Sequence, residues 1–191
     1  MAHLAPQQMI GCGLNKTRGA VGIDISPLTQ ADVLVDVDVP PWPFPSNTFD
    51  RIVCRHIVEH VKDLVRFMEE VYRIGKPGGV VEIVTPHFSN RYSYTDPTHL
   101  RHLSWRSLDY FTEPEMRPLS IMERLLELRH PIPRFYSRAR FRFRRRFLDF
   151  GRPYRWLGVQ RLANRWPDLY ELYLTFLFPA RDLYFELEIV K

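Results

Sequence analysis

The sequence has too little cysteine for a disulfide framework. Only two of its 191 residues, Cys12 and Cys54, are cysteines, and two such residues make neither a set of disulfides nor a zinc site. We expect both to be reduced, partly buried thiols at strand ends. Internal repeats and low-complexity linkers are also missing from the sequence, and together with the length this favours a single domain over residues 1–191.

Long hydrophobic runs are missing too. No apolar stretch approaches the ~20 residues that span a bilayer, so no transmembrane segment is predicted. The N-terminal region has no basic stretch followed by an apolar one, which predicts a cytoplasmic location.

Charge is spread unevenly along the chain. Residues 1–95 contain 9 basic and 10 acidic residues, whereas residues 96–191 contain 18 and 12. Between Arg129 and Arg165 there are 12 arginines and a single acid. Because the planar fork of arginine suits phosphate and carboxylate, we predict a cationic surface on the second half of the chain.

The first 87 residues predict an α/β fold. Short runs rich in Val and Ile are typical of strands buried on both faces of a parallel sheet, and they lie at 8–10, 21–25, 33–37, 49–54 and 80–85. Apolar residues at a spacing of three to four between 61 and 72 predict a helix. Strand, helix and strand in this order form a βαβ unit.

The other crossovers are short. Residues 26–32 leave room for barely two helical turns, and residues 40–48 contain too much proline for a helix. One face of the sheet should therefore be thinly covered, and either residues 156–178 or a second subunit should cover it. Homodimerisation is thus a hypothesis. The apolar residues that could provide the cover at helical spacing are Leu169, Leu172, Tyr173, Phe176 and Leu177.

Two segments near the C-terminus alternate with the period of a strand. Arginine alternates with other residues over 138–144, and glutamate alternates with apolar residues over 183–190. We expect an antiparallel pair at one edge of the sheet, with arginine and glutamate paired across the solvated face.

Polar and glycine residues follow the predicted strands at the edge where an open α/β sheet binds ligands. Gly11 and Gly13 follow the first strand and allow a close approach of the backbone to a ligand. Asp24 ends the second strand and could accept hydrogen bonds from a ribose, or cap a helix. Asp36 and Asp38 end the third strand, and the fourth strand delivers three more polar residues to the same edge, namely His56, Glu59 and His60.

Four segments, taken in order, resemble the class I S-adenosylmethionine-dependent methyltransferases, and within them the methyltransferase type 11 group. They are GCG at 11–13, GIDIS at 22–26, PFPSNTFDRIVCRHIVEHV at 43–61 and IGKPGGVVEIVTP at 74–86. The resemblance covers roughly residues 8–112, which would form the cofactor-binding core, while residues 113–191 would complete the sheet. It implies a Rossmann-like sheet of seven strands, mostly parallel with the last strand antiparallel, and S-adenosylmethionine as cofactor.

The resemblance also implies which residues bind this cofactor: Gly11, Cys12, Gly13, Asp24, Ile25, Asp36, Val37, Arg55 and His56. The glycines would cradle the methionine part, Asp24 would hold the ribose, and Asp36 would flank the adenine. Arg55 and His56 would line the pocket near the methyl group. The motif departs from the family pattern because it lacks an acid before the first glycine, a third glycine, and a helix before the first strand. The missing glycine also disfavours NAD, whose site needs G-x-G-x-x-G.

The segment after the fifth strand, residues 87–111, should face the transferred methyl group. His99 is the candidate general base, because imidazole titrates near neutral pH; the alternative is that Asp96 and His99 form a structural turn. The residues expected to contact the acceptor are His60, His87, Asp96 and His102. No spacing matches a zinc ligand set, so we predict no metal.

The arginine-rich segment 135–147 has three interpretations: an edge strand with a solvated face, a site for an anionic acceptor or membrane surface, or a nucleic-acid site. We therefore expect a methyltransferase acting on an O or N atom of a small or glycan-like, anionic acceptor. The alternatives are a catalytically silent cofactor- or anion-binding protein of the same fold, or an RNA methyltransferase.

Overall fold

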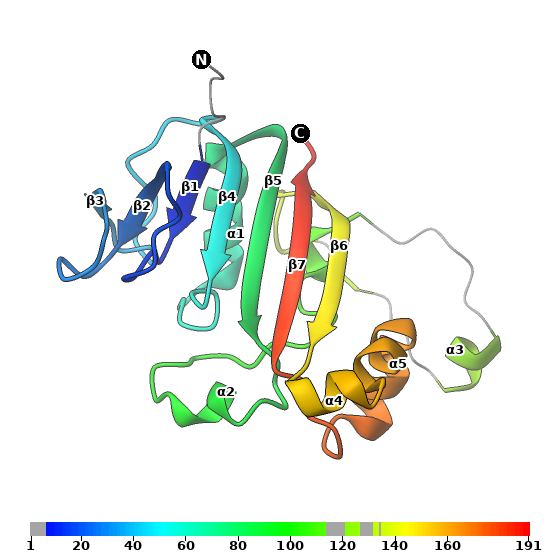
Figure 1. The fold of residues 1–191 in the computed structure, drawn as a ribbon. Helices are drawn as coiled ribbons and strands as arrows, with labels where there is room; N and C mark the ends of the chain where they lie inside the picture. The colour runs from blue at the N-terminus through cyan, green and yellow to red at the C-terminus, as the bar shows by residue number, and fades with distance from the viewer. Residues whose placement is uncertain (1–6, 114–120, 127–131, 134) are drawn as a thin grey trace.

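The protein forms a seven-stranded sheet in the order β3-β2-β1-β4-β5-β7-β6 (Figure 1). The computed structural model describes residues 7–113, 121–126, 132–133 and 135–191. Strand β7 runs antiparallel to both of its neighbours, and β1 to β5 pair in parallel. The strands are β1 Gln7–Ile10, β2 Ala20–Asp24, β3 Val33–Leu34, β4 Phe49–Arg55, β5 Gly75–Pro86, β6 Phe141–Asp149 and β7 Asp182–Ile189. The predicted fold class and sheet are confirmed.

Helix α1, Leu64–Ile74, is the crossover between β4 and β5. The Asp63 side chain caps its N-terminus by accepting hydrogen bonds from the backbone N–H groups of Val65 and Arg66. Its apolar stripe is buried against the sheet and contains Phe67, Met68, Val71 and Ile74. This face of the sheet holds the main core, to which alternate residues of β7 contribute Leu183, Phe185, Leu187 and Ile189.

The remaining helical elements are short and follow β5 or β6. They are α2 Tyr92–Thr95, η1 Asp109–Phe111, α3 Ile121–Leu125, α4 Arg152–Trp156, α5 Val159–Arg165, α6 Pro167–Leu169 and the π-helical turn η2 Tyr170–Leu174. No helix of the described part of the chain is long and apolar enough to cross a membrane.

The sheet face opposite α1 has little cover, as the short crossovers predicted. No described helix lies over β4, β5 and β7 on this side (Figure 1). The expectation that residues 156–178 fold over it is wrong, because this segment lies beyond the ends of the strands. Charged side chains line the face instead: Glu82 of β5 binds Arg51 and Arg55 of β4. A face built of paired charges can meet water, and its cover by a second subunit stays a prediction.

Both ion pairs between β4 and β5 share Glu82, whose carboxyl is almost buried. Burial alone would raise the pKa of Glu82, but hydrogen bonds from Arg55 and Arg51 outweigh it and lower that pKa overall. The predicted pairing of arginine with glutamate on the last two strands is confirmed as well, by a contact of 3.3 Å between Arg144 and Glu188.

Some boundaries differ from the prediction. Strand β3 has two residues in place of five, because the chain turns away at Val35. Strand β6 begins at Phe141 in place of residue 138 and continues to Asp149; the alternation there is interrupted by a register shift between Phe143 and Arg145, which the period of two could not reveal. Both cysteines are free, as predicted, but they are fully buried.

The C-terminal helices lie at the carboxyl end of the parallel strands. Their predicted covering residues are mostly exposed: Leu172, Tyr173, Phe176 and Leu177 all face away from the core. Tyr170 and Thr175 are the buried residues of this stretch. The helical period was predicted correctly, but the side with Tyr170 and Thr175 packs against the core in place of the predicted side.

Candidate functional site

The first element of the site is the turn after β1. Gly11 and Gly13 adopt positive φ angles of 63° and 50°, a region that favours glycine. A Cβ at Gly11 would lie 3.0 Å from the side chain of Ile57, so glycine lets the turn pack closely against Ile57. The segment between Gly11 and β2 forms turns and contains no helix, in contrast to the strand-to-helix turn of the dinucleotide folds.

Asp24 at the end of β2 holds this turn in place. One carboxylate oxygen accepts a hydrogen bond from the backbone N–H of Gly13 at 3.0 Å, and the other accepts one from Ser26 at 3.1 Å. Each oxygen keeps a further lone pair for a ligand hydroxyl. Asp24 therefore caps a turn and not a helix, and it remains able to bind a ribose.

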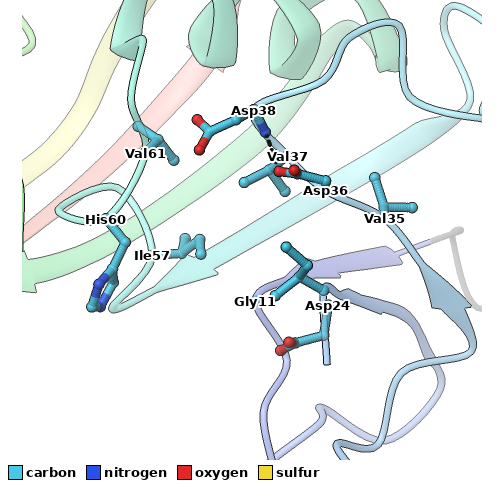
Figure 2. A pocket seen from close by; sticks show the side chains of 10 residues that line it. Gly11, Asp24, Val35, Asp36, Val37, Asp38, Ile57, His60 and Val61 are labelled. Atoms are coloured by element: carbon cyan, nitrogen blue, oxygen red, sulfur yellow. Dashed lines mark hydrogen bonds between the residues drawn. The ribbon is translucent and has the colours of Figure 1, made fainter. Parts of the chain in front are cut away.

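A cavity of about 140 Å³ opens beside Asp24 (Figure 2). In Figure 2, Asp24 and Gly11 form one side, the stretch from Val35 to Asp38 forms another, and His60 closes the third. The lining residues are Gly11, Asp24, Ile25, Val35, Asp36, Val37, Asp38, Ile57, His60 and Val61. The structure thus brings together five predicted cofactor-binding residues, Gly11, Asp24, Ile25, Asp36 and Val37. We call this space the first cavity.

A second cavity of about 620 Å³ shares His60 with the first. It is lined by His56, Glu59, His60, Pro86, Asn90, Tyr92, Thr95, Asp96, Pro97, His99, Arg181 and Asp182. It therefore collects the end of β4, the segment after β5 and the start of β7. Four predicted residues line this space: His60 and Asp96, expected to contact the acceptor, His99, the candidate base, and His56, which was expected beside the cofactor and does not line the first cavity.

Two imidazoles of the second cavity have defined tautomers. His99 Nδ1 lies 3.0 Å from the carbonyl oxygen of Ser93, which can only accept, so this nitrogen carries the proton. His60 Nδ1 lies 2.9 Å from the hydroxyl of Thr98, which itself donates to Asp96. Each neutral ring therefore keeps its lone pair on Nε2. Such a nitrogen can act as a proton acceptor.

His56 and Glu59 form an ion pair at the wall of the second cavity. His56 Nδ1 lies 3.4 Å from the carboxylate of Glu59, which is almost completely buried. Interaction with Glu59 raises the pKa of the His56 imidazole above its ordinary value. His56 also has a positive φ of 51°, an uncommon backbone conformation for a residue other than glycine.

Five predicted residues, Gly13 among them, line neither cavity. Arg55 binds Glu82 on the open face of the sheet, because its side chain alternates away from the site. Cys12 is buried beneath the turn. His87 is buried and binds Glu171 at 2.9 Å, and His102 stacks on Tyr94 and contacts Ser93. Gly13 touches the first cavity only through its bond to Asp24.

Sequence reasoning missed two residues of the second cavity, Arg181 and Asp182. Asp182 begins β7 and Arg181 precedes it. Both lie far along the chain from every motif, and no local signal marks them. Burial raises the pKa of the Asp182 carboxyl. Their place in the site follows only from the insertion of β7 beside β5.

Metal binding was predicted to be absent. Within the described ranges, Glu59, His60 and His99 place ligand atoms within 4.8 Å of one another. This group belongs to the second cavity, and the absence of a metal remains a prediction.

Comparisons with known proteins agree with this geometry. Residues 10–83 match the family model described as a methyltransferase domain. The chain is 31% identical over 108 residues to a "probable S-adenosylmethionine-dependent methyltransferase" of Mycolicibacterium smegmatis, which covers 50% of the chain and 42% of that protein. It is 36% identical over 62 residues to a sterol 24-C-methyltransferase of Pneumocystis carinii, which covers 32% of the chain and 16% of that protein. The chain thus spans less than half the length of either relative.

A solved structure shows the same fold. The S-adenosylmethionine-dependent methyltransferase of Archaeoglobus fulgidus superposes with a TM-score of 0.58 at 18% identity, covering 97% of this chain and 86% of that one. Family model, relatives and fold all agree with the resemblance to class I S-adenosylmethionine-dependent methyltransferases that the motifs predicted. The cofactor of that class is S-adenosylmethionine, and the cavity beside Asp24 and the free acceptors of its carboxylate fit it.

Proposed function

We propose that the chain transfers a methyl group from S-adenosylmethionine to an oxygen or nitrogen atom of a hydroxyl-rich, glycan-like acceptor. The observation that supports this best is the pair of cavities that share His60. The first would hold the cofactor and the second the acceptor. When bound, the cofactor supplies an electrophilic methyl group on its sulfonium.

Several residues of the first cavity would hold the cofactor. Asp24 would accept hydrogen bonds from the ribose hydroxyls, and Asp36 with Val37 would flank the adenine. The turn of Gly11 and Gly13 would cradle the methionine part, and no atom lies within 4 Å of the place where a Cβ of Gly13 would be. Since methyl transfer depends mainly on in-line placement, holding the two reactants in adjoining cavities can provide most of the acceleration.

The polar lining of the second cavity supports a hydroxyl-rich acceptor. Three carboxyl groups, of Glu59, Asp96 and Asp182, can accept hydrogen bonds from hydroxyls. Arg181 is the one arginine of this lining, and it supports an anionic group on the acceptor. None of the described arginines between 129 and 165 lines this cavity, so the anionic character depends on Arg181.

His99 is the proposed general base. Its Nδ1–H is held by the carbonyl of Ser93, and its Nε2 lies 3.8 Å from Asp96 at the cavity wall. A neutral imidazole in this tautomer could take the proton from an attacking hydroxyl. The alternative role, a structural turn formed with Asp96, is supported by the hydrogen bonds of Thr98 to the same carboxylate.

The alternatives predict different behaviour of the purified protein. A silent cofactor-binding protein would bind S-adenosylmethionine and methylate nothing, and an RNA methyltransferase would label RNA. A homodimer, which we retain as a proposal, would have twice the monomer mass in solution. We also propose a cytoplasmic location, in line with two free thiols.

The test combines cofactor binding with transfer. Calorimetric titration with S-adenosylmethionine measures binding, and incubation of a cell extract with cofactor carrying a labelled methyl group identifies the acceptor. Label in a small, hydroxyl-rich fraction would support the proposal. Cofactor binding without any transfer, or label confined to RNA, would contradict it.

A further inference from the structure

The C-terminal helices carry a surface that the proposed reaction does not use. Eight large apolar side chains between residues 156 and 177 are between 48% and 85% exposed. They are Trp156, Leu157, Leu162, Trp166, Leu172, Tyr173, Phe176 and Leu177. Soluble proteins rarely expose so many apolar side chains on one short segment, and such patches mark interaction sites. We call the outer side of residues 152–177 the cap surface.

Exposed arginines are interleaved with these apolar residues. Arg152, Arg155, Arg161 and Arg165 are all exposed, and none forms an ion pair with a described acid. Both acids of the same segment face the protein: Asp168 binds Arg106, and Glu171 binds His87 and the backbone N–H of Trp105. The cap surface is therefore both apolar and purely cationic.

Arginine and apolar side chains share the exposed side of α5. Arg161 and Arg165 are one helical turn apart on α5, directly beside Leu162 and Trp166, while the buried side of the same helix carries Ala163. This arrangement of tryptophan, leucine and arginine is typical of helices that lie in the plane of a bilayer surface, with apolar side chains in the headgroup region and guanidinium groups at the phosphates.

We propose that the cap surface docks on a lipid bilayer that contains anionic headgroups. A second copy of the chain fits less well, because a symmetric contact would place these arginines against each other. Nucleic acid fits less well too, because four of the eight apolar residues are leucines, which do not stack on bases.

The C-terminal helices lie beyond the carboxyl ends of the parallel strands (Figure 1), the edge at which β4 and β5 deliver residues to the second cavity. Phe176 of the cap contacts Phe88, two residues after Pro86 of the second cavity, with ring centroids 6.3 Å apart. Docking would thus keep the acceptor cavity close to the membrane, where a lipid-linked acceptor is held. This last step rests on the proposed function, whereas docking itself does not.

The test is sedimentation of the full chain with vesicles. We expect binding to vesicles of phosphatidylcholine and phosphatidylglycerol, weaker binding as salt rises, and little binding to phosphatidylcholine alone. The pair R155Q/R161Q should weaken binding about 25-fold, at about fivefold for each arginine. The pair W156S/F176S should weaken it at least about tenfold, because two inserted aromatic rings are lost.

Matched controls flank β2, which lies near the side of the sheet opposite to β6. Leu28 is as exposed as Trp156, and Arg18 is an exposed arginine without an ion pair to any described acid. L28S and R18Q should bind vesicles as the unaltered chain does. Calorimetric binding of S-adenosylmethionine by all variants shows that they are folded, and it separates a failure of docking from a failure of the proposed function.

Three outcomes would overturn docking. The first is equal binding to neutral and anionic vesicles, or none to either. The second is unchanged vesicle binding in both cap variants. The third is an oligomer or an RNA complex that W156S/F176S abolishes while the unaltered chain ignores vesicles; this would assign the cap surface to that partner.

Discussion

Replacing Asp24 with asparagine should separate its two roles, holding the turn and binding the ribose. The carboxylate accepts one backbone N–H on each oxygen, at 3.0 and 3.1 Å. Asparagine keeps the size but has one accepting oxygen and an amide that only donates. Asp24→Asn therefore loses one hydrogen bond in the turn and one charge-assisted hydrogen bond to the ribose.

The expected loss of cofactor affinity follows from the lost hydrogen bond to the ribose. A hydrogen bond to a charged group contributes about 1.5–3 kcal/mol, which corresponds to a Kd for S-adenosylmethionine between about tenfold and 150-fold higher. Titration calorimetry measures this ratio directly, and thermal unfolding measures what the turn loses in stability.

Asp32 offers a matched control. Its carboxylate also accepts a backbone N–H, from Gly22 at 2.7 Å, and binds Lys16 at 2.7 Å, but it does not line the first cavity. Asp32→Asn should lose stability of a similar size, while its Kd should change by less than about threefold. Equal losses of affinity in both variants, or an Asp24→Asn affinity within threefold of the original, would refute the assignment of Asp24 to the ribose.

Three further predictions concern titratable side chains. His99→Gln should lower turnover by about a hundredfold or more while cofactor affinity stays constant; unchanged turnover excludes the base role. Glu59→Gln should lower the raised pKa of His56 toward about 6.5, observable by NMR titration. Because that pKa is raised in the folded state, the ion pair should stabilise fully below about pH 6.5 and cease to do so as pH rises through the folded pKa. Glu82→Gln should lower the free energy of unfolding in urea by about 1–2 kcal/mol at neutral pH, since the arginine partners of Glu82 are half-exposed. Because the pKa of Glu82 is lowered, this difference should vanish as pH falls below about 4.5 through the folded pKa. A difference that stays constant with pH contradicts the ion-pair explanation.

Local sequence patterns predicted most of the sheet. The runs of Val and Ile and the period of α1 depend on neighbouring residues, so they could be interpreted without the fold. The same holds for Gly11, Asp24 and Asp36, because every parallel strand delivers its carboxyl end to one edge.

The direction in which each polar side chain points was harder to predict. Arg55 and His56 are adjacent, yet one faces the open side of the sheet and the other the second cavity. His87 and His102 follow β5 as expected, but Glu171 and Tyr94 engage them away from the acceptor space. A list of polar residues near a strand end does not say which alternate side chains point inward.

The amino-acid sequence alone determined the strands, the helix between β4 and β5, and the acids and glycines of the cofactor edge, because these depend on residue type and short-range period. Only the tertiary structure decided that Arg181 and Asp182 line the second cavity. It also decided that ion pairs line the open face of the sheet, and that the side chains of Trp156 and Phe176 point outward from the C-terminal helices. Each of these depends on contacts between segments far apart in the chain, and a helical or strand period cannot tell which of its faces will find a partner.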